Sequence, residues 1–282
     1  MKTIAIQGLE GSFHDIAAHG YFAGEDIRLI CCATFEQVFE NIRRSPDTVG
    51  LVAIENTIAG SLLHNYELLR DSGTVVAGEY KLRISHCICC LPEDSWETVT
   101  EVHSHPVALM QCRGFLANRP ELKAVEAEDT AGSAKFIAGN NCRGWAAICS
   151  RQAAEMYGMK VLEDKIEDNK HNFTRFLVVV TPGREDALRT HGEADKASLV
   201  FSLPHEEGSL SQVLSILSFY KINLTKIQSL PIIGHEWEYM FYVDVIYNSA
   251  TRFRQCMDAI VPLTKELKIL GEYRHDGTNP TI

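Results

Sequence analysis

Four short polar segments combine residue types that can hold and process a small anion. The first, Gly8–Phe13, reads Gly-Leu-Glu-Gly-Ser-Phe and joins a predicted strand to a predicted helix. Its glycines permit a tight turn and let backbone N–H groups at the helix start face an anion. The segment lacks the three-glycine dinucleotide fingerprint and the Gly-Lys-Ser/Thr of a phosphate loop. A purely structural turn therefore explains it equally well.

Two further segments place small polar residues at the ends of predicted elements. Glu55–Ser61 directly follows a strand, and its carboxylate, amide and hydroxyl groups can orient a polar ligand. Capping of the next helix is an equally good explanation. Glu128–Ala134 begins a helix and can offer backbone N–H groups to a carboxylate, although helix capping by Asp129 alone accounts for it too.

The fourth segment, Asn172–Phe176, opens a long apolar strand. Arg175 can bind a carboxylate with its forked guanidinium, while the Thr174 hydroxyl adds a hydrogen bond. Taken alone, Arg175 is more simply a surface residue of an edge strand. A His-Ser-His-Pro sequence over 103–106 has no third ligand at a metal-binding spacing, so we predict no metal site.

These segments lie in a first part of the chain where strands alternate with helices. Such alternation favours an α/β domain with largely parallel strands and ligands at their carboxyl ends. The pattern predicts one strand over 81–91 and one helix from Pro106 to about Asn118. A long apolar strand, Phe173–Val180, is the last element of this part.

The pattern then changes character. A polar stretch over 184–196 is typical of a linker. Beyond it the predicted order is strand, helix, strand, strand, helix, strand, which is the ferredoxin-like βαββαβ arrangement. The predicted division is a first domain over 1–181, a linker over 182–196, a second domain over 197–275 and a tail over 276–282.

The composition limits the classes of function. The chain has 282 residues, 27 basic and 37 acidic side chains, and a formal charge of -10. Nucleic acids and anionic membranes bind clustered Lys and Arg, so we expect neither as a partner, whereas a small anion needs only local positive groups. The chain has no signal-peptide core and no apolar run of roughly 18 residues, so we predict a cytoplasmic protein. The nine cysteines are an odd number and are predicted to be reduced packing residues.

Taken together and in order, these segments resemble prephenate dehydratase with a C-terminal ACT regulatory domain. The segments that carry the resemblance are Gly8–Phe13, Glu55–Ser61, Ser104–Pro106 with Gln111 and Cys112, Asp129–Ala134, Asn172–Phe176, Gly208–Leu210 and Asn223–Ile227. The resemblance covers essentially the whole chain. It implies an α/β fold with a two-lobed catalytic domain that resembles the type II periplasmic binding-protein fold, an active site between the lobes, and a ferredoxin-like βαββαβ (ACT) domain.

The reaction that the resemblance implies converts prephenate to phenylpyruvate, CO₂ and water, a step of L-phenylalanine biosynthesis catalysed by a carbon–oxygen lyase. Because loss of CO₂ and hydroxide creates an aromatic ring, no redox cofactor or metal is expected. The enzyme need only fix two carboxylates, desolvate the departing one and assist the hydroxyl. By resemblance Thr174 is the essential hydroxyl, Arg175 the carboxylate clamp and Phe176 a packing wall.

The resemblance also implies a lining for the cleft. The other predicted substrate-binding residues are Ser12, Asn56, Thr57, Ser61, Gln111, Thr130, Ala131 and Gly132. A threonine is too weak an acid to protonate the leaving hydroxyl unaided at neutral pH. Glu55, His14 and His105 are alternative proton sources, and the sequence does not choose among them.

The ACT-like part implies feedback regulation by L-phenylalanine. It also implies pairing of two copies through their sheets, so we expect a homodimer and, from the family, a dimer of dimers. The predicted effector-binding residues are Gly208, Ser209, Leu210, Asn223, Leu224, Gln228 and Ser229. The family's Glu-Ser-Arg-Pro motif reads Gln-Ser-Leu-Pro over 228–231 here, which removes a carboxylate and a guanidinium from the expected site. Phenylalanine binding remains the favoured expectation.

Two other functions fit part of the pattern. An arogenate dehydratase performs the same elimination on the transaminated side chain, and the sequence is nearly silent on that choice. A non-catalytic two-lobed protein that senses a carboxylate would share the fold. It gives no reason for Thr174–Phe176 to accompany an ACT-like domain. We therefore predict a prephenate dehydratase.

Overall fold

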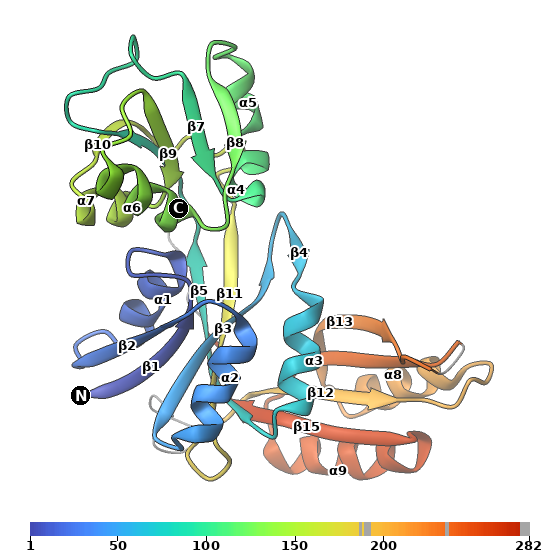
Figure 1. The fold of residues 1–282 in the computed structure, drawn as a ribbon. Coiled ribbons are helices and arrows are strands. Elements are labelled where there is room, and N and C mark those ends of the chain that lie inside the picture. The colour runs from blue at the N-terminus through green and yellow to red at the C-terminus, as the bar shows by residue number, and fades with distance from the viewer. Residues whose placement is uncertain (186–187, 189–192, 235–236, 277–282) are drawn as a thin grey trace.

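The computed structural model describes residues 1–185, 188, 193–234 and 237–276, which form three sheets with their own helices (Figure 1). The sheet of the first lobe has the order β2-β1-β3-β11-β5, and a short β4 pairs with β3. Its strands are β1 (Lys2–Gln7), β2 (Ile27–Cys32), β3 (Thr48–Asn56), β4 (Gly60–Ser61), β5 (Val75–Arg83) and β11 (Phe173–Val180). Its helices are α1 (Phe13–Tyr21), α2 (Phe35–Arg44) and α3 (Leu63–Asp71).

The second lobe is built entirely from the chain between β5 and β11. Its sheet has the order β10-β6-β9-β7-β8. The strands are β6 (Cys87–Cys90), β7 (Glu101–Ser104), β8 (Lys123–Glu126), β9 (Trp145–Cys149) and β10 (Lys160–Asp164). The helices are α4 (Pro106–Gln111), α5 (Arg113–Ala117), α6 (Thr130–Asn140) and α7 (Arg151–Met156). The chain therefore crosses between the lobes twice, over 84–86 and over 165–172, and β5 and β11 rise side by side toward the second lobe in Figure 1.

The remaining elements confirm the predicted βαββαβ arrangement. They are β12 (Lys196–Ser202), α8 (Ser209–Phe219), β13 (Asn223–Pro231), β14 (Tyr239–Ile246), α9 (Ala250–Ile260) with a 3₁₀ turn (Val261–Leu263), and β15 (Glu266–Tyr273). The strands pair antiparallel in the order β13-β14-β12-β15. Residues 186–187 and 189–192 of the predicted linker and 277–282 of the predicted tail lie outside the described residues.

Three expectations about the first part of the chain were wrong. The strand expected over 81–91 is two strands in different sheets, because the chain leaves β5 after Arg83 and crosses to the other lobe before β6. The helix expected from Pro106 breaks at Cys112 into α4 and α5. The first lobe is not largely parallel, because β11 returns from the second lobe and pairs antiparallel with both β3 and β5.

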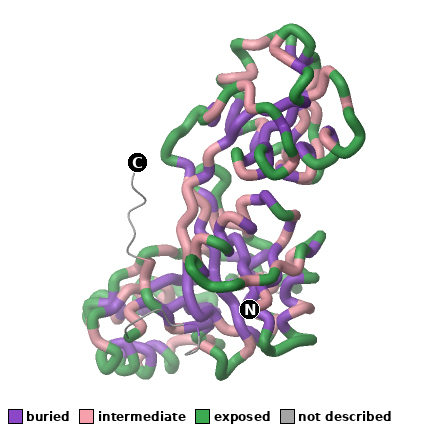
Figure 2. The backbone as a smooth tube through the Cα atoms, turned by 90° about the vertical axis from the view of Figure 1, so that its left-hand side faces the viewer, coloured by how far each residue is buried: buried purple, intermediate pink, exposed green. Residues whose placement is uncertain are grey.

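Strand β11 is buried on both faces, as its continuous apolar sequence indicates. Alternate side chains of a strand point to opposite faces. Phe176 and Val178 join the core beneath α1, whereas Leu177 and Val179 join a second core on the other side. Figure 2 shows buried strands running through the centre of the first lobe.

That second core joins the first lobe to the βαββαβ unit. Helices α8 and α9 cover one face of the β13-β14-β12-β15 sheet, and the other face packs on the first lobe beside α3 (Figure 1). Tyr66 of α3 and Tyr242 of β14 meet here with ring centroids 5.1 Å apart. Close contact between β15 and β5 places Gly271 where an added Cβ would lie 2.1 Å from the carbonyl oxygen of Val76. The βαββαβ unit is thus packed directly against the sheet that carries β11.

Candidate active site

A cavity of about 270 Å³ lies between the two lobes. The first lobe and the crossover at 84–86 supply Gln7, Ser12, Phe13, His14, Ala53, Asn56, Ala59, Leu62, Ile84, His86, Thr174 and Phe176. The second lobe supplies His105, Val107, Ala108, Gln111, Glu128, Asp129 and Thr130. The cavity is therefore the interlobe cleft that a two-lobed fold predicts.

Asn56 fixes the hydroxyl of Thr174 from the neighbouring strand. The two residues are register partners on β3 and β11, and Asn56 Nδ2 donates to Thr174 Oγ1 at 3.0 Å. The amide of Asn56 has one orientation only, because its Oδ1 accepts from the backbone N–H groups of Ile58 and Ala59. Since Thr174 Oγ1 is the acceptor in this bond, its own proton is left to point elsewhere. The arrangement makes Thr174 a hydrogen-bond donor toward the cleft.

The Asn56 amide continues into a buried network that spans both lobes and both crossovers. Asn56 Nδ2 also donates to Asn172 Oδ1 at 2.7 Å, and Asn172 Nδ2 donates to Gln111 Oε1 at 2.9 Å. Gln111 Oε1 lies 2.9 Å from Nε2 of His86, and Gln111 Nε2 lies 3.4 Å from Asn56 Oδ1. Every buried side-chain nitrogen and oxygen of this network has a partner except Nδ1 of His86, so the amides are held in one arrangement. The position of Thr174 therefore depends on residues of both lobes.

Two helix starts supply backbone hydrogen-bond donors at the wall of the cleft. Of the described residues that line it, none is a lysine or an arginine. Helix α1 begins beside Ser12 and α6 begins at Thr130, both at the cavity wall. The first N–H groups of a helix have no intrahelical partner and carry the positive end of the helix dipole. Two helix starts from opposite lobes thus face the cavity, where a carboxylate can accept hydrogen bonds from them.

Three histidines line the cavity in different states. Burial lowers the pKa of His14 to about 4, so its ring is neutral near neutral pH. Burial also lowers the pKa of His86, although its contact with Gln111 opposes the shift. His105 Nδ1 accepts from the backbone N–H of Val107 at 3.2 Å, so a proton on the neutral ring sits on Nε2. Nε2 of His105 is free of this capping bond, and the ring is half-buried.

The lobes are in contact on one side of the cleft. Ser150 Oγ donates to the carbonyl oxygen of Gly11 at 2.7 Å, and Tyr157 Oη donates to that of Glu10 at 2.7 Å. Gly11 has φ +84°, and a Cβ there would lie 2.9 Å from Ala153 of α7. Only glycine fits both the backbone conformation and this approach. The glycines of the Gly8–Phe13 segment therefore serve the closing of the cleft around the start of α1.

Several predicted site residues are brought together here. The predicted residues that line the cavity are Ser12, Asn56, Gln111, Thr130, Thr174 and Phe176. The structure corrects three others. Thr57 is exposed and bonds to the 171–173 backbone, donating to His171 and accepting from Phe173. Ser61 accepts a bond from Lys226 of β13 at 2.9 Å, and Ala131 is buried in the core under α6.

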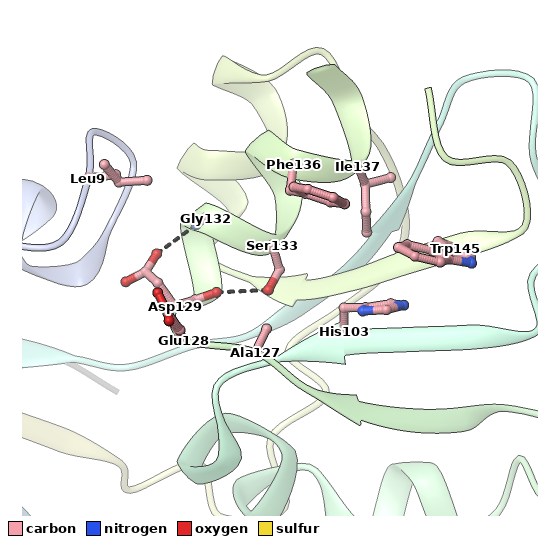
Figure 3. Close-up of a pocket in the computed structure, with 10 residues that line it drawn as sticks. All are labelled: Leu9, His103, Ala127, Glu128, Asp129, Gly132, Ser133, Phe136, Ile137 and Trp145. Carbon is pink, nitrogen blue, oxygen red and sulfur yellow. Dashed lines mark hydrogen bonds between the residues drawn. The ribbon is translucent and has the colours of Figure 1, made fainter. Parts of the chain in front are cut away.

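The fourth corrected residue, Gly132, lies at a separate cavity of about 370 Å³ on the second lobe (Figure 3). Its N–H donates to Asp129 Oδ1 at 2.6 Å, so it caps α6 instead of facing the cleft. Figure 3 places the rings of His103 and Trp145 on adjacent strands beneath Phe136 of α6, and the His103 and Trp145 ring centroids are 4.2 Å apart. This second cavity is an aromatic slot, and it shares Glu128 and Asp129 with the cleft.

Arg175 does not reach the cleft, so its expected role as the substrate clamp is corrected. It is 5% exposed and lies on the face of β11 opposite Thr174 and Phe176. Its guanidinium pairs with Glu55 at 2.7 Å, with Glu79 at 3.1 Å and with Asp244 of β14. Glu55 is held on the same face, and the pKa of its carboxyl is lowered because Arg175 and Lys226 outweigh the effect of burial. Glu55 is therefore not a proton source in the cleft.

Among the cavity residues that the sequence did not assign to the site are Phe13 and His86. They meet edge to face across the cavity, with ring centroids 5.3 Å apart. His86 lies in a crossover that the sequence pattern predicts as the middle of a strand. Glu128 and Asp129 also line the cavity. Their segment was expected as a helix start that faces a carboxylate or as a capped helix, and their side chains were not predicted to line the cleft.

The predicted effector residues fall at two ends of α8. Gly208, with φ +82°, precedes the helix, and Ser209 and Leu210 line a cavity of about 140 Å³ with Trp237 and Tyr239. Asn223 and Leu224 begin β13 beyond the other end of α8, and Gln228 and Ser229 lie farther along that strand. An 11-residue helix is roughly 16 Å long, so one chain does not bring Asn223 and Leu224 to the cavity at Ser209. Ser229 is the register partner of Phe241, which lines that cavity, so Gln228 and Ser229 lie back toward it.

No group of three His, Cys, Asp or Glu side chains is placed to hold a metal ion within the described ranges. The nine cysteines are all free thiols, and seven of them are buried in the hydrophobic cores of the two lobes and the βαββαβ unit. None of the helices described here is long and apolar enough to span a membrane. A cytoplasmic location stays a prediction.

Fold and site together define a two-lobed α/β protein with a polar interlobe cleft and an attached βαββαβ unit. A family model for prephenate dehydratase matches residues 4–184. Arogenate dehydratase 3, chloroplastic, of Arabidopsis thaliana is 36% identical over 296 residues, covering 98% of this chain and 68% of that protein. The bifunctional chorismate mutase/prephenate dehydratase of Enterobacter agglomerans is 30% identical over 280 residues, covering 98% and 72%. The chain belongs to the prephenate dehydratase family, whose dehydratases are carbon–oxygen lyases.

Solved structures agree with this membership. Prephenate dehydratase from Arthrobacter aurescens in complex with L-Phe has a TM-score of 0.87 and 25% identity, covering 99% of this chain and 92% of that one. A protein described as a novel type of quorum quenching acylase, GqqA, has a TM-score of 0.86 and 27% identity, covering 98% and 99%. The fold therefore extends over the whole chain, βαββαβ unit included.

Proposed function

We propose that this protein converts prephenate to phenylpyruvate, CO₂ and water, and so acts in L-phenylalanine biosynthesis. The observation that carries the proposal is the Thr174 hydroxyl, which Asn56 orients inside the interlobe cavity of a chain from this family. We also propose the division into a catalytic domain over 1–181, a linker over 182–196, an ACT domain over 197–275 and a tail.

The substrate is a dianion, and the helix starts beside Ser12 and Thr130 are placed to accept its two carboxylates. Apolar walls such as Leu62 and Phe176 strip water from the departing carboxylate, which favours its loss. The carbon–carbon bond to that carboxylate breaks, and its electron pair enters the ring as the carbon–oxygen bond to the hydroxyl breaks. The ring becomes aromatic, and the hydroxide requires one proton to leave as water.

Thr174 and His105 divide the handling of the leaving hydroxyl. Thr174 donates its free proton as a hydrogen bond to the departing oxygen, because its oxygen is already occupied as acceptor for Asn56. The proton itself passes through Nε2 of His105, which lines the cavity on a half-buried ring and is resupplied by solvent. The neutral His14 and the ion-paired Glu55 are less suited to this task.

The test is turnover of prephenate by the full chain, read as the absorbance of phenylpyruvate in base. We expect turnover in the wild type and its loss in Thr174→Ala. A wild-type protein that is folded but turns over neither prephenate nor arogenate would contradict the proposal. The same preparation tested for amide hydrolysis would then distinguish an acylase.

Arogenate is the second candidate substrate, and two observations favour it. The relatives include Arogenate dehydratase 3 of Arabidopsis thaliana, and the charged side chains that line the cavity are the carboxylates of Glu128 and Asp129. Arogenate carries an ammonium group where prephenate carries a keto oxygen, so these carboxylates can pair with it. Competition of the two substrates in one assay gives the ratio of their kcat/KM values and decides the preference.

L-phenylalanine is the proposed effector, and a homodimer through the ACT domains is the proposed assembly. A similar prephenate dehydratase was solved in complex with L-Phe. Asn223 and Leu224 lie at the opposite end of α8 from Gly208, Ser209 and Leu210, so a site that needs both groups takes one from each of two copies. Exposed apolar side chains on this domain supply an interface, with Ile227 41%, Ile233 91% and Trp237 69% exposed.

Equilibrium dialysis and sedimentation of the full chain test this part separately from catalysis. We expect saturable phenylalanine binding at millimolar concentration or below, and at least a dimer. Further association into a dimer of dimers is the expected larger state. A monomer that binds no phenylalanine would overturn both proposals.

A further inference from the structure

A buried cluster of charges joins the βαββαβ unit to the strands that carry the candidate catalytic residues. We call it the interface ion cluster. Its members are Arg175, Glu55 and Glu79 from the first lobe, and Asp244, Lys196 and Lys226 from the βαββαβ unit. Each part of the molecule supplies three charged side chains, and the cluster is neutral as a whole.

Three contacts of the cluster cross from one sheet to the other: Arg175 with Asp244, Lys196 with Glu79, and Lys226 with Glu55. Arg175 reaches Glu55 and Glu79 on its own sheet and Asp244 on β14. Lys196 of β12 lies 2.7 Å from Glu79. Lys226 of β13 pairs with Glu55, and Ser198 Oγ donates to Asp244 Oδ1 at 2.6 Å.

The cluster lies directly behind the candidate catalytic pair. Arg175 follows Thr174 in β11, and Glu55 precedes Asn56 in β3, so both neighbours point to the opposite face of the sheet. The pairing of β11 with β3 also shifts register between Arg175 and Phe176, which marks an irregular place in the ladder. Side chains on the rear face therefore help to set where the Thr174 and Asn56 backbones stand.

We propose that Arg175 is a positioning residue, held by Asp244 of the βαββαβ unit, that sets the placement of Thr174 against Asn56 in the cleft. The proposal rests on the proposed function for its kinetic consequence. It also links the position of the βαββαβ unit to the rate of catalysis, because any shift of β14 relative to β11 must move or break this ion pair.

The physical reason is the burial of the pair. Arg175 is 5% exposed and Asp244 is 3% exposed, so neither charge can turn to water when its partner moves. Breaking a buried pair is far more costly than breaking a surface pair, so the two strands move together. A displacement of about 1 Å at a catalytic group is enough to slow a reaction by roughly a hundredfold. A modest shift of the sheet therefore displaces Thr174 and slows the reaction.

The experiment measures kcat and KM of Asp244→Asn in the full chain. Asp244 lies outside the cleft, so the kinetic effect of its substitution distinguishes two roles of Arg175: clamping the substrate and positioning Thr174. The positioning role predicts that kcat falls about tenfold while KM stays within about twofold. The conservative Asp244→Glu keeps the charge and should recover part of the rate. Lys265→Gln, an exposed site on the same domain, is the matched control and should leave kcat unchanged.

A second variant keeps the test decisive if Asp244→Asn does not fold. Ser198→Ala removes one bond to Asp244 and keeps every charge, and we expect kcat to fall about twofold to threefold. A raised KM with unchanged kcat in the folded variants would overturn the proposal, as would kcat and KM both equal to those of the wild type.

Amide hydrogen exchange separates this proposal from the proposed function. Peptides that cover 172–177 should exchange faster in Asp244→Asn or Ser198→Ala than in the wild type, whichever reaction the cleft catalyses. Unchanged exchange in this segment would refute the positioning role. A wild type without dehydratase activity, together with faster exchange, would refute the proposed function and keep the positioning role.

Discussion

The two faces of β11 carry different kinds of polar contacts. On the cleft face, Thr174 and Phe176 stand in a cavity whose described lining has no lysine or arginine, and neutral amides hold the reactive hydroxyl. On the rear face, Arg175 sits among three carboxylates from two domains. Full charges are thus used where domains must be fixed, and backbone dipoles are used where an anionic substrate must enter and leave.

This difference shows that charged side chains alone do not mark the place where the substrate binds. A guanidinium in the cleft would bind both substrate and product carboxylates tightly, whereas helix starts offer weaker and directional N–H groups. The buried charges at the rear are costly to leave unpaired, which makes them effective at specifying how the domains pack. The following variants separate the two faces, from the largest expected effect to the smallest.

The largest effect is expected at the rear face. Lys196→Met leaves the interface ion cluster with one uncompensated negative charge, because Lys196 pairs with Glu79 inside the interface. Breaking a buried ion pair costs about 3–5 kcal/mol, and thermal or urea unfolding measures the loss. Lys2→Met, which breaks the exposed pair with Glu25, is the control and should cost at most about 1 kcal/mol. Equal losses in the two variants would contradict the distinction between the faces.

The next effect belongs to the cleft face. Thr174→Ala removes the hydrogen-bond donor to the leaving hydroxyl, and we expect kcat to fall about 10²–10³-fold. Unfolding should be almost unchanged, since Thr174 is half-buried and its neighbours remain. Thr174→Ser keeps the hydroxyl and should retain most of the rate. Near-normal kcat in Thr174→Ala would remove this residue from the mechanism.

A smaller loss of rate is expected from Asn56→Asp, which changes one amide to a carboxylate of the same shape. The donor to Thr174 Oγ1 is replaced by an acceptor, so the Thr174 proton turns away from the substrate toward Asp. We expect kcat to fall roughly tenfold to a hundredfold, as misplacement of a catalytic group does. Steady-state kinetics of Asn56→Ser, which still offers a donor, should show a milder loss. The reverse order of the two variants would argue against an oriented hydroxyl.

The smallest effect is a difference in how the two faces respond to acid. Burial lowers the pKa of His14 in the cleft from 6.5 to about 4, so the unfolded chain binds a proton that the folded chain does not. Stability should therefore fall as the pH drops from 6.5 to 4, by at most about 1.4 kcal/mol per pH unit. His14→Gln should flatten this part of the curve.

Glu79 acts in a lower pH range. Burial alone would raise the pKa of Glu79, but Lys196 and Arg175 outweigh it and lower the pKa from 4.5 to about 2. Its stabilising contribution is present above pH 4.5 and is lost as the pH falls toward 2. Urea unfolding of Glu79→Gln across this range should show a flatter slope than the wild type. The same slope in both would mean that Glu79 is not the titrating group.

The sequence alone determined the class of fold and part of the cleft. The βαββαβ order of the second domain follows from its local pattern of strands and helices. The cleft residues Thr174, Asn56, Gln111 and Thr130 were predictable through the resemblance of their segments to a known family, and the structure places them in one cavity. The positions of Asn56 and Thr130 at a strand end and a helix start agree with this, because an α/β fold gathers such positions at one edge.

The sequence also contains the information on which side chains of β11 share a face, because alternate side chains of a strand point to opposite faces. Thr174, Arg175 and Phe176 are consecutive, so only the first and third can share a face. A rule of period two therefore excluded a cleft position for Arg175 once Thr174 was placed there. Which partner would take its charge was beyond the sequence, because Asp244 lies on a strand of another domain.

Tertiary structure alone decided the connections between distant segments. The break between β5 and β6 that carries His86 into the cleft looks like one strand in the sequence, because no glycine or proline marks the crossover Ile84–His86. The interface ion cluster joins residues as far apart as Glu55 and Lys226, and no local pattern pairs them. Local propensity fixes elements and their ends, whereas the pairing of buried charges is fixed only when two sheets are packed and water is excluded between them.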